Sequence, residues 1–185
     1  MIKRTAVFIT SITLFSATLF AQDAKKEVET IKTKMDVFSS KTGSITKYID
    51  TKLPALKTTY ATVENRVRKI TSGNITGYFY QIEKEGKYSN STASIEYLDL
   101  LEILKALQIL KQDLPKDLTL NPDYLENKFI TVDGFNVGYF VSKGKATWYI
   151  TLEKYGSDNT LIIENVDVIE TAFTKAKNTI EELKK

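Results

Sequence analysis

Two segments of the chain carry the same residue pattern, and this repetition constrains the fold more than any other feature of the sequence. SIEYLDLLEIL (Ser94–Leu104) corresponds to IIENVDVIETAF (Ile162–Phe173), so that Glu96 aligns with Glu164. Three upstream matches keep the same order and nearly the same offset: Thr62-Val63-Glu64 with Thr131-Val132-Asp133, Ser72-Gly73 with Lys143-Gly144, and Ile82-Glu83-Lys84 with Leu152-Glu153-Lys154. The offset shifts only where turns are expected, and turns tolerate insertions. The sequence therefore predicts a duplicated unit, with chance similarity of two ββα segments as the alternative.

Each unit contains short extended segments joined by turns, followed by a helical pattern. We therefore expect an α+β fold: an antiparallel β-sheet built from two tandem ββββα-like repeats, with helices packed on one face. Repeat one is expected over residues 56–112 and repeat two over 125–184, with an N-terminal β-hairpin at 34–52 outside the repeats. The proline-containing segment Asp113–Tyr124 is the expected connection between the repeats.

The N-terminal segment, residues 1–21, has the pattern of a signal peptide. Lys3 and Arg4 precede an uncharged run over residues 6–20, and Ala21 supplies the small residue at the cleavage position. The uncharged run is too short for a good membrane span, although an uncleaved anchor helix is the alternative. We expect an exported protein, periplasmic or secreted, whose mature part is a single α+β domain over residues 22–185 without a membrane span.

Charge and composition exclude several classes of function. Without Lys3 and Arg4 the mature chain has nearly equal numbers of basic and acidic residues, so it is not expected to bind nucleic acid. It contains no Cys and no His, which excludes disulfides, Ser-His-Asp and Cys-His catalysis, and zinc sites built on His or Cys. No cofactor and no metal site are predicted.

Two pairs of acids stand at the start of the repeated helices. Asp99 and Glu102, like Asp167 and Glu170, have the Asp-x-x-Glu spacing of a capping box, in which the first acid accepts a backbone N–H and the second reaches back. We expect all four to be structural helix caps rather than metal ligands or an acid/base pair.

The candidate binding residues are Arg66, Arg68, Phe79 and Tyr149. Arg66 and Arg68 are the only arginines left after signal cleavage. Their spacing of two on a strand puts both side chains on one face. Two neighbouring guanidinium groups could bind a carboxylate, a phosphate or a sulfate. The alternative is cross-strand pairing with an acid such as Asp50 or Glu83. Phe79 and Tyr149 occupy equivalent outward positions in the two repeats, where they are either exposed for binding or covered.

The opposite faces of these strands are expected to point inward. The predicted core residues are Tyr78, Tyr80 and Ile82 in the first repeat and Trp148, Ile150 and Leu152 in the second. The helix of the first repeat has apolar residues around most of its circumference, which indicates either a central helix or a surface that meets a partner.

The sequence thus favours an exported, non-catalytic protein that binds an unidentified protein or glycan partner in the cell envelope or outside it. One alternative is a carrier that holds a small apolar ligand between helix and sheet, beneath Leu100–Leu110. A carboxylate-dependent hydrolase is the other alternative, although no acid pair stands out for that role.

Overall fold

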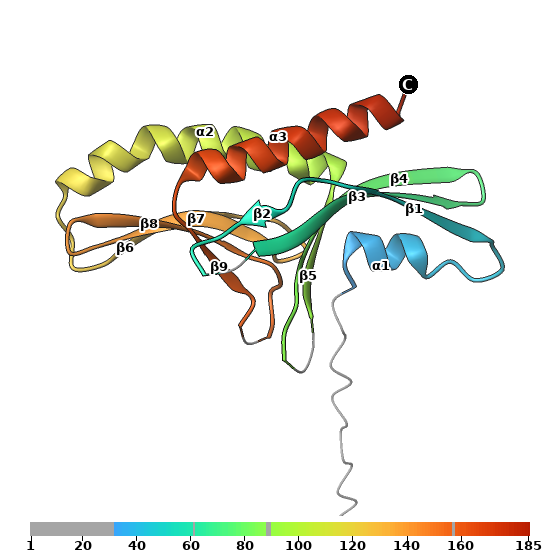
Figure 1. The fold of residues 1–185 in the computed structure, drawn as a ribbon, viewed down its shortest axis with the longest axis horizontal. Helices are drawn as coiled ribbons and strands as arrows, with labels where there is room; N and C mark the ends of the chain where they lie inside the picture. Colours follow the sequence, from blue (N-terminus) through green and yellow to red (C-terminus); the bar gives the residue numbers. More distant parts are fainter. Residues whose placement is uncertain (1–31, 61, 88–89, 157) are drawn as a thin grey trace, which may run out of the picture. The chain divides into compact units, whose positions relative to one another are not determined.

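Two antiparallel sheets hold all the strands of the computed structural model, which describes residues 32–60, 62–87, 90–156 and 158–185 (Figure 1). The first sheet has the strand order β1-β3-β4-β5, with the short β2 paired to the start of β3. Its strands are β1 (Thr46–Lys52), β2 (Leu56–Lys57), β3 (Thr62–Ser72), β4 (Ile75–Lys84) and β5 (Ser91–Glu96). The second sheet has the order β6-β7-β8-β9. Its strands are β6 (Leu125–Ile130), β7 (Asn136–Ser142), β8 (Lys145–Thr151) and β9 (Thr160–Ile163).

Three helices accompany the sheets in the described residues: α1 (Lys34–Ser39), α2 (Tyr97–Thr119) and α3 (Val166–Leu183). None of these helices is long and apolar enough to cross a membrane. The predicted signal peptide, residues 1–21, lies outside the described residues. The prediction of an α+β fold with antiparallel pairing is confirmed, with two sheets rather than one.

Glycine fixes the turn between β6 and β7, as the Asp133-Gly134 pair predicts. Gly134 has φ +90°, a conformation that side chains disfavour, and a Cβ at this position would collide with Lys154. The turn closes through a hydrogen bond from Thr131 N to Phe135 O at 2.9 Å. This turn places Val132 and Asp133 at one end of the second sheet.

One hydrophobic core joins both sheets to α2 and α3. Phe173 of α3 links the two sheets, because its ring centroid lies 5.1 Å from that of Tyr80 on β4 and 5.8 Å from that of Phe135 next to β7. The six predicted inward residues all belong to this core or pack against it. The inward pattern read from the strands is therefore confirmed.

Helix α2 has two exposed apolar residues despite its central position. It contacts α3 and strands of both sheets, and Leu100, Ile103 and Leu107 have no exposed surface. Leu98 and Ile109, however, are 61% and 59% exposed on the outer side. The helix is thus central, but it is not buried around its whole circumference.

The predicted N-terminal hairpin is wrong. Lys34–Ser39 form α1, and β1 pairs with β3 instead of folding back on the segment before it. The helix starts at a capping box in which Thr33 Oγ1 accepts from Asp36 N and the Asp36 carboxylate accepts from Thr33 N. A local capping box thus begins a helix where the first strand of the hairpin was expected.

Helix α1 lies on the face of the first sheet opposite to α2 and α3 (Figure 1). Tyr80 contacts Phe173 of α3, whereas its neighbour Phe79 has an edge-to-face contact with Phe38 of α1 at 6.2 Å. Consecutive residues of a strand point to opposite faces. The prediction that the helices pack on one face is therefore wrong for α1.

The predicted helix caps are also wrong, because both helices begin earlier than expected. Helix α2 starts at Tyr97, so Asp99 lies in the first turn and its carboxylate accepts from Lys34 Nζ at 2.6 Å, while Glu102 is exposed. The N-cap of α3 is Asn165, whose side chain accepts from Asp167 N at 2.9 Å.

The acids of α3 bind α2 instead of capping their own helix. Lys111 Nζ lies 3.1 Å from Asp167 Oδ1 and 2.6 Å from Glu170 Oε2. At its other end α2 runs through Pro115 to Thr119, so the segment Asp113–Tyr124 is partly helical rather than a connection throughout.

Candidate functional site

A polar cleft of about 500 Å³ lies between α1, the first sheet and two loops of the second sheet. The first sheet supplies the floor through side chains of β3, β4 and β5, on the face opposite to α2 and α3. The walls come from the start of α1 and from residues 132–135 and 152–155. The cleft thus gathers residues from segments that are far apart in the sequence.

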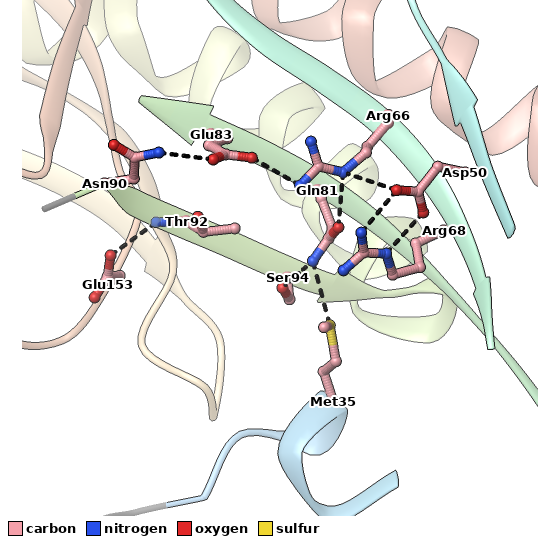
Figure 2. Close-up of polar contacts among 10 residues, drawn as sticks. All are labelled: Met35, Asp50, Arg66, Arg68, Gln81, Glu83, Asn90, Thr92, Ser94 and Glu153. Carbon is pink, nitrogen blue, oxygen red and sulfur yellow. Dashed lines mark hydrogen bonds and ion pairs between the residues drawn. The ribbon is translucent and has the colours of Figure 1, made fainter. Parts of the chain in front are cut away.

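Arg66 lies on the cleft floor and is held by two neighbours from β4. Its Nε donates to Gln81 Oε1 at 3.0 Å, and its Nη2 donates to Glu83 Oε2 at 2.7 Å (Figure 2). This arrangement follows from register, since Arg66 pairs with Gln81 directly across the ladder. The hydrogen bonds from Arg66 and Asn90 hold the pKa of Glu83 below its usual value.

Arg68 makes a bidentate ion pair with Asp50 of β1. Both Nε and Nη2 of Arg68 donate to the carboxylate at 2.7 Å, and the same carboxylate lies 3.4 Å from Arg66 Nε. The hydrogen bond from Arg68 lowers the pKa of Asp50, and that same bond raises the pKa of Arg68. The two arginines share one face, as predicted, and they pair with Asp50 and Glu83 as the alternative interpretation proposed.

Gln81 connects the arginine row to α1. It is only 2% exposed, and its Nε2 donates to Ser94 Oγ at 2.8 Å and to Met35 Sδ at 3.3 Å. Its Oε1 accepts from Arg66, so the whole amide is engaged. The orientation of the Arg66 side chain is therefore fixed by a buried neighbour rather than by solvent.

The opposite wall carries two further carboxylates. Glu153 Oε1 accepts from Thr92 N at 2.8 Å, on the open edge of β5, and Asp133 Oδ2 accepts from Lys34 N at 2.9 Å. Burial raises the pKa of Asp133, although the hydrogen bond from Lys34 opposes this shift. Both acids thus bind backbone groups of neighbouring segments.

Two exposed side chains stand beside these acids at the mouth of the cleft. Val132 is 81% exposed and Tyr155 is 68% exposed, and both line the cleft. The charged residues of the lining balance closely: Arg66, Arg68 and Lys154 stand against Asp36, Glu83, Asp133 and Glu153. Such a surface favours neutral or zwitterionic polar groups over a simple anion.

The predicted aromatic binding residues do not lie on an open surface. Phe79 is 1% exposed because α1 covers it through Phe38. Tyr149 is 6% exposed, and its hydroxyl donates to Glu126 Oε1. Both side chains are covered, which was the alternative to exposure for binding, and neither lines the cleft.

The sequence did not single out Gln81, Glu153, Asp133 or Tyr155. The alternation of β4 places Gln81 on the same outward face as Glu83, but the cleft above it could not be predicted because α1 was expected to be a strand.

In the described part of the chain, no group of three or more acidic side chains is placed to hold a metal ion. Comparisons with protein-family models, with curated proteins and with solved structures found no match.

Proposed function

We propose that this chain is an exported, non-catalytic binding protein of the cell envelope or extracellular space, and that the cleft holds a polar segment of a protein or glycan partner. The observation that carries the proposal is the fixed row Arg66-Gln81-Ser94 beside the exposed side chains of Val132 and Tyr155. Side chains that are already held in place lose little conformational entropy on binding. An apolar contact within a polar rim is typical of interaction surfaces.

A non-catalytic role agrees with how the carboxylates of the cleft are used. Glu83 accepts from Arg66 and Asn90, Glu153 accepts from a backbone N–H, and Asp133 accepts from another. A carboxylate-dependent hydrolase needs one acid and one base that are free to exchange protons with a substrate. At Glu83 the hydrogen bonds from Arg66 and Asn90 favour the charged form and so oppose such an exchange.

Export is proposed from the N-terminal pattern of Lys3-Arg4, the uncharged run and Ala21.

The carrier alternative requires space beneath Leu100–Leu110. The inward side chains of that range are packed into the core, with Leu110 only 4% exposed. The cleft therefore supports the binding interpretation better than the carrier as first placed.

We also propose that the two sheets and their helices arose by duplication of one ββββα unit. The cross-strand pairs support this, because Val67↔Tyr80 in the first sheet and Val137↔Ile150 in the second are related by a single offset that applies to both partners. The hairpin ends Ser72↔Ile75 and Ser142↔Lys145 are related by the same offset. In this scheme β1 corresponds to β6, and α2 and α3 are the equivalent helices that pack on one face.

A capture experiment with the mature protein, residues 22–185, tests the proposed function. The bait is incubated with native envelope extract and culture fluid beside three variants: Val132→Glu, Arg66→Ala/Arg68→Ala, and Ile109→Glu as a control on α2. We expect a partner that the native protein and the Ile109 variant retain and that the two cleft variants lose. A partner retained equally by the Val132→Glu variant would contradict the proposal, and circular dichroism checks that each variant is folded.

A further inference from the structure

An apolar groove of about 530 Å³ lies beside α3 and is separate from the polar cleft. One side is formed by residues 53–57, which we call the strap, and the other by Val168, Thr171 and Ala172 of α3. The strap side is Leu53, Pro54, Ala55 and Leu56, so most of the lining is hydrocarbon. A volume of this size lies within the range of small-molecule sites in proteins.

Hydrogen bonds hold the strap in place along its length. Leu53 N donates to Asn65 O at 3.1 Å, and Asn65 Nδ2 donates to Pro54 O at 3.0 Å. Further along, Leu56 pairs with Val63, and Thr59 N donates to Ile162 O at 2.9 Å. The strap is therefore fixed to both sheets, while the small side chains of Ala55 and Ala172 leave the space beside α3 open.

The charged lining of the groove consists of two lysines and one carboxylate. Lys57 and Lys175 line it, and within the described ranges neither has an ion-pair partner. Asp167 also lines the groove, but its carboxylate is already bound by Lys111 on α2. An anionic group at the rim would thus complement two unpaired ammonium groups.

Asn65 supplies a second, independent indication of a ligand. Asn65 lines the groove and is 4% exposed, and its Oδ1 has no hydrogen-bond partner among the residues that the structure describes. Buried acceptors are nearly always paired, so an unpaired one at a groove calls for a donor from outside the chain. The Nδ2 atom is a donor and already donates to Pro54 O, so Oδ1 is the acceptor that this side chain offers to a ligand.

We propose that this groove binds a single-chain anionic amphiphile, with the acyl chain between the strap and α3, the head group at Lys57 and Lys175, and a hydrogen-bond donor of the head group directed at Asn65. The proposal goes beyond the polar cleft, since none of these residues lines it. It also differs from the carrier first expected, because the apolar ligand would lie beside α3 rather than beneath α2. Binding here and binding in the cleft are independent properties.

Isothermal titration with N-dodecanoylglycine below its micelle concentration tests the site. We expect saturable one-to-one binding that Ala172→Trp weakens at least tenfold by filling the groove, and that Lys57→Glu/Lys175→Glu weakens similarly. The control Glu182→Trp adds the same ring at an exposed position on α3 and should leave binding unchanged. Thermal unfolding of each variant confirms that the fold is retained.

Two matched ligands test the head-group assignments. Dodecyltrimethylammonium has the same chain with a positive head and should bind at least tenfold more weakly. N-dodecanoylsarcosine lacks the amide N–H and should lose several-fold in affinity to the native protein. No saturable binding, or binding that Ala172→Trp leaves unchanged, would overturn the proposal, and equal affinity for the sarcosine compound would overturn the role of Asn65.

Discussion

At the residue scale, the ion pair between Arg68 and Asp50 is the interaction at the cleft floor whose contribution to stability can be measured most directly. The pair is bidentate at 2.7 Å and only partly exposed, so its coupling should exceed that of an ordinary surface pair and reach about 1 kcal/mol. A double-mutant cycle with Arg68→Ala and Asp50→Ala, measured by urea unfolding at pH 7 through the fluorescence of Trp148, checks this value.

The same pair should make stability depend on acid. The folded-state pKa of Asp50 is below its ordinary 3.8, so its contribution is present above that value and is lost as the pH falls through the lowered pKa. The cycle repeated toward pH 3 should therefore give a smaller coupling, and Asp50→Asn should flatten the acid limb of the stability curve. A coupling that stays constant between pH 7 and pH 3 would contradict this account.

How far individual side chains could be predicted depends on what covers them. Strand alternation alone places Arg66 and Arg68 on one face and Tyr80 in the core, because the period of two needs no tertiary information. The burial of Phe79 could not be predicted in the same way, since it depends on Phe38 of a helix expected to be a strand. The acids that pair with the arginines were among the expected partners, but the choice of Asp50 depends on the register of β1.

At the scale of elements, the start of α3 is fixed by Asn165 rather than by Asp167. The Asn165 side chain accepts from Asp167 N, so Asn165→Ala should lower the free energy of unfolding by about 1 kcal/mol. Asp167→Ala leaves this cap in place and removes only an exposed ion pair with Lys111, so it should cost less. Chemical denaturation of both variants decides between them, and a larger loss for Asp167→Ala would favour Asp167 as the cap.

Helix α1 is the element whose placement decides whether the cleft exists. It is held by the contact of Phe38 with Phe79 and by the bond of Lys34 with Asp99. Phe38→Ala should destabilise the protein by about 1 kcal/mol and remove the hydrogen-exchange protection of Lys34–Ser39, while β3 and β4 keep theirs. Val37→Ala is the matched control, because Val37 is exposed on the same helix; equal loss of protection in both variants would argue against this anchoring.

Two physical causes explain the elements that the sequence misplaced. A six-residue helix is too short for a clear hydrophobic period, so the pattern of segment 34–39 does not distinguish a helix from a strand, and the helix depends on its capping box and on the contact of Phe38 with β4. The early start of α2 and α3 has a different cause: the Asp-x-x-Glu spacing fits a capping box, but acids of this pattern bind Lys34 and Lys111 instead. The turn between β6 and β7, in contrast, can be read from the sequence itself, because Asp133-Gly134 is a strong hairpin signal.

At the scale of the molecule, one shared core predicts that residues 32–185 unfold as a unit. Phe173 contacts both sheets, α2 packs on both, and Thr59 N bonds Ile162 O between them. Urea unfolding followed by Trp148 fluorescence, which reports on the second sheet, should therefore coincide with far-ultraviolet circular dichroism of the whole chain. Transitions separated by more than their experimental error would show that the two sheets are independently stable.

The most direct test of the central claim, that the cleft is a binding surface, is site-specific photo-crosslinking in the organism of origin. Benzoylphenylalanine replaces either Val132, which is exposed in the cleft, or Ile109, which is exposed on α2. We predict a defined crosslinked product from position 132 that Arg66→Ala abolishes, and none from position 109. The same products from both positions, or none from position 132, would contradict the account.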